Sequence, residues 1–200
     1  MKITKIIQQV KTKSRYSIFV DGAYGFSLSE PALLESKLTR GQELSATDLK
    51  SWKNRSAEDK VSVNALRYAA MRLRSRWEME MYLQRKNVSP PLAEIILNKL
   101  IKINILNDLT FAQSWIANRR LLRPTSKRKL QQELRAKRVS DEIIEKVFSE
   151  DETTELEVLN ELIAKKRRLP KYKSDKLKLM QYLARQGFNY GDIKNILEDK

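Results

Sequence analysis

The sequence predicts a mostly α-helical protein built from tandem three-helix repeats, with a small antiparallel β-sheet at its N-terminus. A pattern of apolar residues at helical spacing recurs about every 50 residues, which is typical of stacked helical units. Five glycines and five prolines in 200 residues favour long helices over sheets. Short aromatic and β-branched runs occur only near the start of the chain. We expect the repeats to stack into an elongated curved array, because each covers an apolar face that its neighbour cannot bury alone.

Residues 1–44 predict a β-rich cap with a short helix. Asp21-Gly22 separates the runs 14–20 and 24–28, and this dipeptide is a strong hairpin signal because both turn positions need positive φ. A third strand is expected at Ile3–Val10. Alternation along the run 24–28 predicts that three of its side chains share one face of the strand: Tyr24, Phe26 and Leu28. We interpret this module as a packing cap.

Helices fill the rest of the chain. A connecting helix at 45–60 starts at Ser45 or Thr47, and the stretch 53–60 is polar enough to interrupt it. Three repeats follow, at 61–106, 107–150 and 151–200. Their helices are expected at Val61–Leu73, Ser75–Lys86 and Pro90–Ile103, then from an Asn107 or Asp108 cap to Leu122, in Ser126–Arg138 and at Asp141–Phe148, and finally at Glu152–Arg168, Ser174–Gln186 and Tyr190–Glu198.

Composition excludes several classes of chemistry. The chain has no cysteine and no histidine, which removes disulfides, thiolate nucleophiles, imidazole bases and the usual zinc sites. Glu78, Glu80 and Asp108 are the obvious carboxylates for a metal-dependent nuclease. However, Glu78 and Glu80 point in nearly opposite directions on a helix, and Asp108 lies where an N-cap is wanted. We therefore predict a protein that is not an enzyme and that uses no cofactor or metal.

The formal net charge of +15 predicts attraction to polyanions, of which nucleic acid is the commonest. No apolar run approaches the roughly 20 residues of a membrane span, and the N-terminus lacks the apolar core of a signal peptide. We expect a cytoplasmic monomer that does not bind membranes.

Positive charge is concentrated at one place in each repeat, namely the end of the first helix, the following turn and the second helix. Residues 141–161, between the two larger clusters, carry nine acids against Lys146. A regular rotation between repeats would bring the clusters together as one basic face, whereas the alternative is three solvated faces that form no continuous surface. The candidate binding residues are Arg72, Arg74, Arg76, Arg119, Arg120, Arg123, Lys127, Arg128, Lys129, Arg135, Lys137, Arg138, Lys165, Lys166, Arg167 and Arg168.

Two other modes of DNA recognition are less consistent with the sequence. A base-reading helix-turn-helix would place 141–148 or 90–100 in the major groove, but the first is acidic and the second nearly uncharged. Tryptophans can stack on the bases of a single strand. Trp115 has the spacing of a core residue, and Trp77, which lies among arginines, is the better candidate for a surface aromatic.

The order and spacing of certain residues resemble the RecX family, bacterial regulators of the recombinase RecA. The resemblance covers most of 41–197 and is carried by Gly41-Gln42, Leu44, Ala65-Leu66-Arg67-Tyr68, Arg74-Ser75, Glu78, Leu83, Lys86, Leu106-Asn107-Asp108, Phe111-Ala112, Trp115, Arg119, Leu130, Glu133-Leu134, Lys137, Leu183, Arg185, Gly187-Phe188 and Tyr190. The family's Lys-Gly after the second helix is Lys86-Asn87 and Lys137-Arg138 here. A left-handed Arg138 would cost about 1 kcal/mol, unless the turn changes.

The resemblance implies tandem three-helix repeats, binding to RecA filaments and to DNA, and inhibition of the RecA ATPase and strand exchange. It implies that Arg74, Arg119, Arg123, Lys127, Arg128 and Lys137 face the filament groove. We expect the RecA filament and the phosphates of single- and double-stranded DNA as partners. The alternative is a general nucleic-acid-binding or architectural protein without a recombinase partner.

Overall fold

The computed structural model describes residues 1–198, which form two compact units. The first contains Met1–Arg72 and Tyr82–Lys102, and the second contains Leu73–Met81 and the chain from Ile103 onward. The division falls inside one helix, α3 (Arg76–Arg85). The last two residues of the predicted third repeat lie outside the described part.

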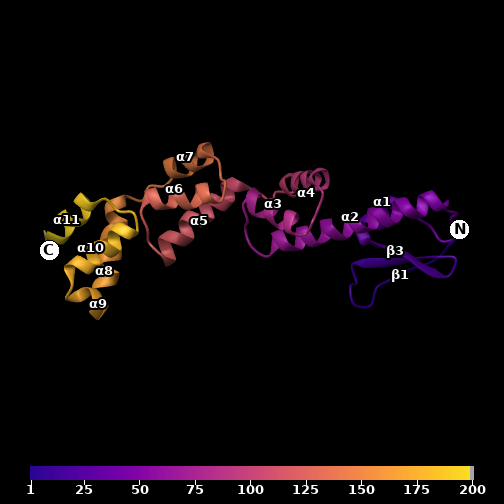
Figure 1. Ribbon diagram of the computed structural model, residues 1–200, viewed down its shortest axis with the longest axis horizontal. Helices are drawn as coiled ribbons and strands as arrows, with labels where there is room; N and C mark the ends of the chain where they lie inside the picture. The colour runs from indigo at the N-terminus through magenta and orange to yellow at the C-terminus, as the bar shows by residue number, and fades with distance from the viewer. Residues whose placement is uncertain (199–200) are drawn as a thin grey trace. The chain divides into compact units, whose positions relative to one another are not determined.

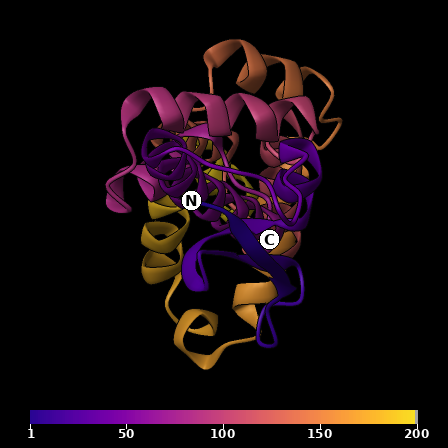
Figure 2. The ribbon, with the colours of Figure 1, turned by 90° about the vertical axis from the view of Figure 1, so that its right-hand side faces the viewer.

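The first unit joins a three-stranded antiparallel sheet to helices. The strands are ordered β1-β2-β3, and α2 lies along β3, with the strands on one side of it in both views (Figures 1 and 2). The elements, besides the end of α3, are β1 (Ile3–Gln8), β2 (Arg15–Val20), β3 (Ala23–Ser29), α1 (Glu30–Ser36), α2 (Ala46–Ala70) and α4 (Pro90–Lys102).

The second unit contains two complete three-helix groups, each with its own apolar core. One core is centred on Phe111, Leu130 and Ile144, and the other on Leu159, Leu183 and Ile193. The helices are α5 (Asp108–Leu122), α6 (Lys127–Ala136), α7 (Asp141–Ser149), α8 (Glu155–Arg167), α9 (Pro170–Lys173), α10 (Lys176–Arg185) and α11 (Tyr190–Glu198). All the expected helical stretches are helical, although 45–60 and Val61–Leu73 form the single helix α2, and the fold class is confirmed. The one-turn helix α9 was not expected; Pro170 stands at its first position, where proline is well tolerated.

The hairpin follows the prediction except at Tyr24. Asp21 and Gly22 both have positive φ, as the turn requires. Ile18 pairs with Phe26 but Phe19 pairs with Tyr24, so Gly25 is an extra residue in β3. This bulge reverses the alternation, because one added residue moves the next side chain to the other face. Tyr24 is therefore 58% exposed while Phe26 and Leu28 are buried, and the prediction that the three share one face is wrong.

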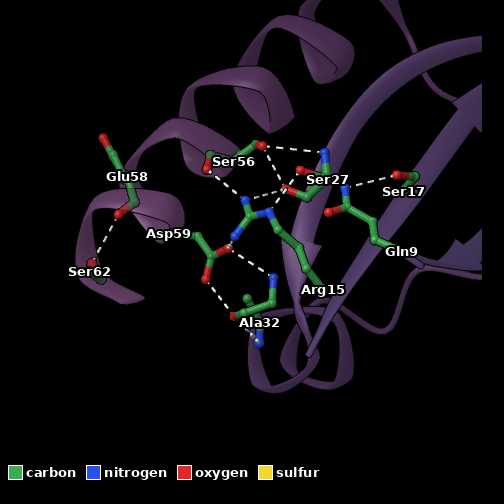
Figure 3. A network of polar contacts seen from close by, with 10 residues as sticks. Gln9, Arg15, Ser17, Ser27, Ala32, Ser56, Glu58, Asp59 and Ser62 are labelled. Atoms are coloured by element: carbon green, nitrogen blue, oxygen red, sulfur yellow. Dashed lines mark hydrogen bonds and ion pairs between the residues drawn. The ribbon is translucent and has the colours of Figure 1, made fainter. Parts of the chain in front are cut away.

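Helix α2 is continuous through 53–60, where the sequence allowed a break. A capping box at Ser45 starts the helix. Two residues of its polar stretch, Ser56 and Asp59, bond to the buried Arg15 of β2 (Figure 3). Arg15 donates to Asp59 at 2.8 Å and to the Ser27 hydroxyl and carbonyl at 2.9 Å each. Ser56 contributes its carbonyl to the same guanidinium. The polarity of this stretch thus reflects a buried ion-pair network and not a loop.

The same turn follows the second helix of every repeat. Asn87, Arg138 and Gly187 adopt left-handed conformations with φ of 54°, 57° and 89°. The next amide in each case bonds back to a leucine carbonyl five residues earlier, at 3.1, 3.2 and 3.4 Å, which is the Schellman pattern. Arg138 therefore keeps the turn in a conformation that glycine adopts without steric cost.

We predict that Arg138→Gly stabilises the protein by about 0.5–1 kcal/mol, because it relieves the left-handed strain of a side chain that makes no ion pair within residues 1–198. Urea unfolding of the variant and the wild type measures the difference. An unchanged or lower midpoint would contradict the assignment of strain to this position.

The opposite substitution at the equivalent position is the matched control. A Cβ on Gly187 would come within 2.3 Å of the Ser126 hydroxyl oxygen, and φ there is 89°. Gly187→Ala is expected to destabilise the protein by more than 1 kcal/mol, with the loss visible in the same titration.

Candidate nucleic-acid interface

Successive repeats in the second unit are joined by a contact that occurs twice. The first residue of one repeat's first helix accepts a hydrogen bond from the first amide of the preceding repeat's second helix. Asp108 accepts from the Arg76 amide at 2.7 Å, and Glu155 accepts from the Lys127 amide at 3.0 Å. Amides in the first turn have no partner within their own helix, so a carboxylate from the neighbour satisfies one and complements the helix dipole. We call this contact the repeat joint.

A second set of bonds in each joint links the N-terminal turn of one second helix to the C-terminal turn of the next. Lys137, at the end of α6, donates to Glu78 of α3 at 2.7 Å. In the next joint the roles are exchanged, because Lys129 of α6 donates to the Arg185 carbonyl and to the Gln186 side chain. The two joints thus use the same helix ends, with the lysine on the C-terminal turn in the first and on the N-terminal turn in the second.

Contacts between the first and second helices use a different chemistry in each repeat. Tyr68 stacks on Tyr82 with ring centroids 3.9 Å apart. At the same place in the next repeat Arg119 pairs with Glu133 at 2.8 Å, and in the last Lys166 lies 4.6 Å from the centre of the Tyr182 ring. The cations of the second and third repeats at this position are thus engaged inside the fold.

The tryptophans are packed rather than presented as stacking platforms. Trp115 donates its indole N–H to Glu133, and its ring carries Arg119 and Lys137 at 4.9 and 5.5 Å. Trp52 stacks on Phe26 with centroids 5.8 Å apart. Trp77 is half-buried.

Most of the candidate basic residues therefore have internal contacts or are buried. Arg74 is buried, with 7% of its surface exposed. The Lys127 ammonium lies 5.1 Å from the centre of the Phe148 ring. The others with partners inside the protein are Arg76, Arg119, Arg120, Lys129, Arg135, Lys137 and Lys166.

Of the remaining candidates, Arg72 is exposed and Arg167 is half-buried. Five others are exposed and make no ion pair with any other residue of 1–198, so their charges are available to a partner. They are Arg123 at the end of α5, Arg128 and Arg138 at the two ends of α6, and Lys165 and Arg168 at the end of α8.

One surface pocket brings together candidates from two clusters that are distant in sequence. It has a volume of about 420 Å³ and lies where the end of α5 meets α8. Arg120, Lys165 and Arg168 supply positive charge, against one acid, Glu161. Its remaining lining is apolar: Leu121, Pro124 and Ala164.

Arg120 is the fixed member of this pocket. Its guanidinium pairs with Asp151 at 3.0 Å and donates to the Thr125 carbonyl, while its buried Nε has no acceptor within residues 1–198. Burial by itself raises the pKa of Asp151, but hydrogen bonds from Thr153 and Arg120 outweigh it and hold that pKa below its usual range. Asp151 therefore stays ionised and keeps the arginine in place.

Sequence reasoning missed the carboxylates that join one repeat to the next. It assigned Asp108 to capping its own helix, whereas Asn107 caps α5 and Asp108 caps α3 of the preceding repeat. Asp108 and Glu155 are each the first residue of the first helix of a repeat, and aligning the repeats on that position would have indicated a shared role. Within residues 1–198, no three carboxylates gather as a metal site would require, and no helix is long and apolar enough to cross a membrane.

Comparison with known proteins places this architecture. Four family models match consecutive parts of the chain: the N-terminal domain of the regulatory protein RecX at 1–45, and the first, second and third RecX three-helix domains at 64–100, 107–147 and 153–197. Regulatory protein RecX of Lactobacillus johnsonii is 33% identical over 191 residues, which cover 94% of this chain and 70% of that protein. The chain belongs to the RecX family. The RecX protein of Bacillus subtilis is 30% identical over 200 residues, covering 98% of this chain and 76% of that protein.

Solved RecX structures share the fold. A crystal structure of a regulatory protein RecX matches all of this chain and 99% of its own with a TM-score of 0.74, at 24% identity. RecX from Lactobacillus salivarius matches 71% of this chain and 95% of its own with a TM-score of 0.59, at 25% identity. The resemblance to the RecX family is confirmed, and this chain is a member of a family of regulatory proteins.

The Asp108 contact in the repeat joint should make the stability of the protein depend on pH. Burial raises the pKa of Asp108 above its usual 3.8, against the hydrogen bond from the Arg76 amide. The folded protein therefore holds this proton to higher pH than the unfolded chain does, and its stability falls as pH rises from about 3.8 through the raised pKa. Asp108→Asn keeps an acceptor without ionising, so its stability relative to wild type should increase over that interval. Urea unfolding of both proteins at pH values on either side measures this.

Asp108→Ala is the control, because alanine offers the Arg76 amide no acceptor. It should be about 1 kcal/mol less stable than Asp108→Asn at neutral pH. Equal stability of the alanine and asparagine variants would show that the bond across the joint contributes nothing.

Proposed function

We propose that the protein binds the RecA nucleoprotein filament and inhibits its ATPase, strand exchange and filament growth, acting as a ligand and not as a catalyst. Membership of the RecX family of regulatory proteins carries this proposal. The exposed cations of the second and third repeats support it, since they provide free positive charge for a partner rich in phosphate.

The joint between these repeats supports the mechanism. Arg128 at the start of α6 and Lys165 and Arg168 on α8 belong to one compact unit, in which the Lys127 amide bonds to Glu155. Several weak contacts held in one frame act at high effective concentration, so that the second and later contacts cost little further entropy. A ligand that spans neighbouring protomers in this way opposes the rearrangements that accompany ATP turnover.

Reversing two exposed charges tests the proposal. Arg123→Glu with Arg128→Glu should raise, by about tenfold or more, the concentration that half-inhibits the DNA-dependent ATPase of RecA. Two lost phosphate contacts should also make the slope of log affinity for duplex DNA against log salt shallower by about 2. The measurements are steady-state ATP hydrolysis and DNA binding across a salt series.

The matched control is Lys50→Glu with Lys53→Glu, which makes the same change in net charge on exposed positions of α2. If the Arg123→Glu, Arg128→Glu variant inhibited RecA at the same concentration as the wild type, this surface would be excluded as the binding site. Inhibition by the wild-type protein only when it saturates the DNA would favour the alternative, a general nucleic-acid-binding protein without a recombinase partner.

A further inference from the structure

The pocket between the end of α5 and α8 differs from the rest of the basic surface, because it is concave and combines charge with an apolar wall. Lys165 and Arg168 are exposed and make no ion pair among the described residues. Leu121, at 75% exposure, is among the most exposed apolar residues of the chain and borders the same pocket. The pocket therefore offers an apolar surface directly beside two cations.

The charges around the pocket indicate an anionic ligand bound weakly on its own. Arg120 is neutralised by Asp151, so the balance rests on Lys165 and Arg168 against Glu161. One net positive charge suits a single phosphodiester better than a highly charged free polyphosphate. Because the charge of Arg120 is already paired, the phosphate of a ligand is expected at Lys165 and Arg168.

The size and the apolar lining restrict the ligand further. About 420 Å³ lies within the range of small-molecule sites and accommodates one nucleotide. Leu121 and Pro124 can cover the apolar face of a sugar or base, which every nucleotide presents whatever its sequence. A duplex buries the faces of its bases by stacking, whereas a single strand exposes them.

We propose that this pocket receives one nucleotide unit of single-stranded DNA, with its phosphate at Lys165 and Arg168 and its sugar and base against Leu121 and Pro124. This inference rests on the DNA contact in the proposed function and does not require RecA. Glu161 opposes the phosphate and limits affinity, which keeps the contact reversible when only one nucleotide is bound.

The test is binding of a fluorescent oligothymidylate to the full chain without RecA. Lys165→Glu with Arg168→Glu should weaken binding about tenfold more than Lys173→Glu with Lys176→Glu, a pair of exposed lysines outside the pocket lining with the same change in charge. Glu161→Gln should strengthen binding several-fold. Equal losses of affinity in the two double variants, or no gain from Glu161→Gln, would overturn the proposal.

A second measurement needs no substitution and identifies the source of the phosphate. In NMR titrations of the wild-type protein, the amides of Ala164, Lys165 and Arg168 should shift with oligothymidylate at concentrations where inorganic phosphate and thymidine monophosphate have no effect. Equal responses to all three would assign the pocket to free anions. Shifts on adding RecA alone, with none on adding the oligonucleotide, would assign it to a protein contact. Loss of oligonucleotide binding with intact ATPase inhibition would separate failure of the pocket from failure of the filament proposal.

Discussion

The carboxylate that caps a helix in the neighbouring repeat is the interaction on which the second unit depends. Asp108 and Glu155 each satisfy an amide at the start of a helix that belongs to the preceding repeat. The second and third three-helix groups have separate cores, and a bond from the Ser126 amide to the Gln186 carbonyl at 3.2 Å adds to the contact between them. Because the first turn of a helix always leaves amides unsatisfied, the joint uses a requirement of every helix to fix the next repeat in place. It also explains why the first turn of α3 belongs to the second unit.

Contacts between repeats use part of the positive charge of the chain, so the net charge overstates what is available to a partner. A formal charge of +15 describes the chain, but many of its lysines and arginines act inside the protein. Lys137 binds Glu78, Lys129 binds the end of α10, and Arg120 binds Asp151. These cations hold repeats together, while Arg123, Arg128, Lys165 and Arg168 remain for a partner. Removing Arg120 or Lys137 leaves a largely buried carboxylate unpaired, so the effect on binding cannot be separated from the effect on folding.

The fold was largely predictable because helix periodicity and turn chemistry are local. Apolar spacing, Asp21-Gly22 and the left-handed position at Gly187 each act within a few residues. Tyr24 was misjudged because the alternation of apolar residues does not reveal a bulge. The stretch 53–60 was misjudged because its polar residues bond to Arg15, which is distant in sequence. The candidate site was predictable only as a set of charges. Which arginines turn inward depends on carboxylates in other helices, such as Glu133 and Asp151, and no local pattern encodes those partners.

Hydrogen exchange at the Arg76 amide tests the joint most directly, because this amide begins α3 and its bond to Asp108 crosses between repeats. If the joint holds the repeats together, the Arg76 amide should exchange only through the opening that also exposes the Leu130 amide in the core of the next repeat, and Asp108→Ala should abolish its protection while Leu130 stays protected. Exchange of the Arg76 amide at the rate of an unprotected helix end in the wild-type protein would contradict the account.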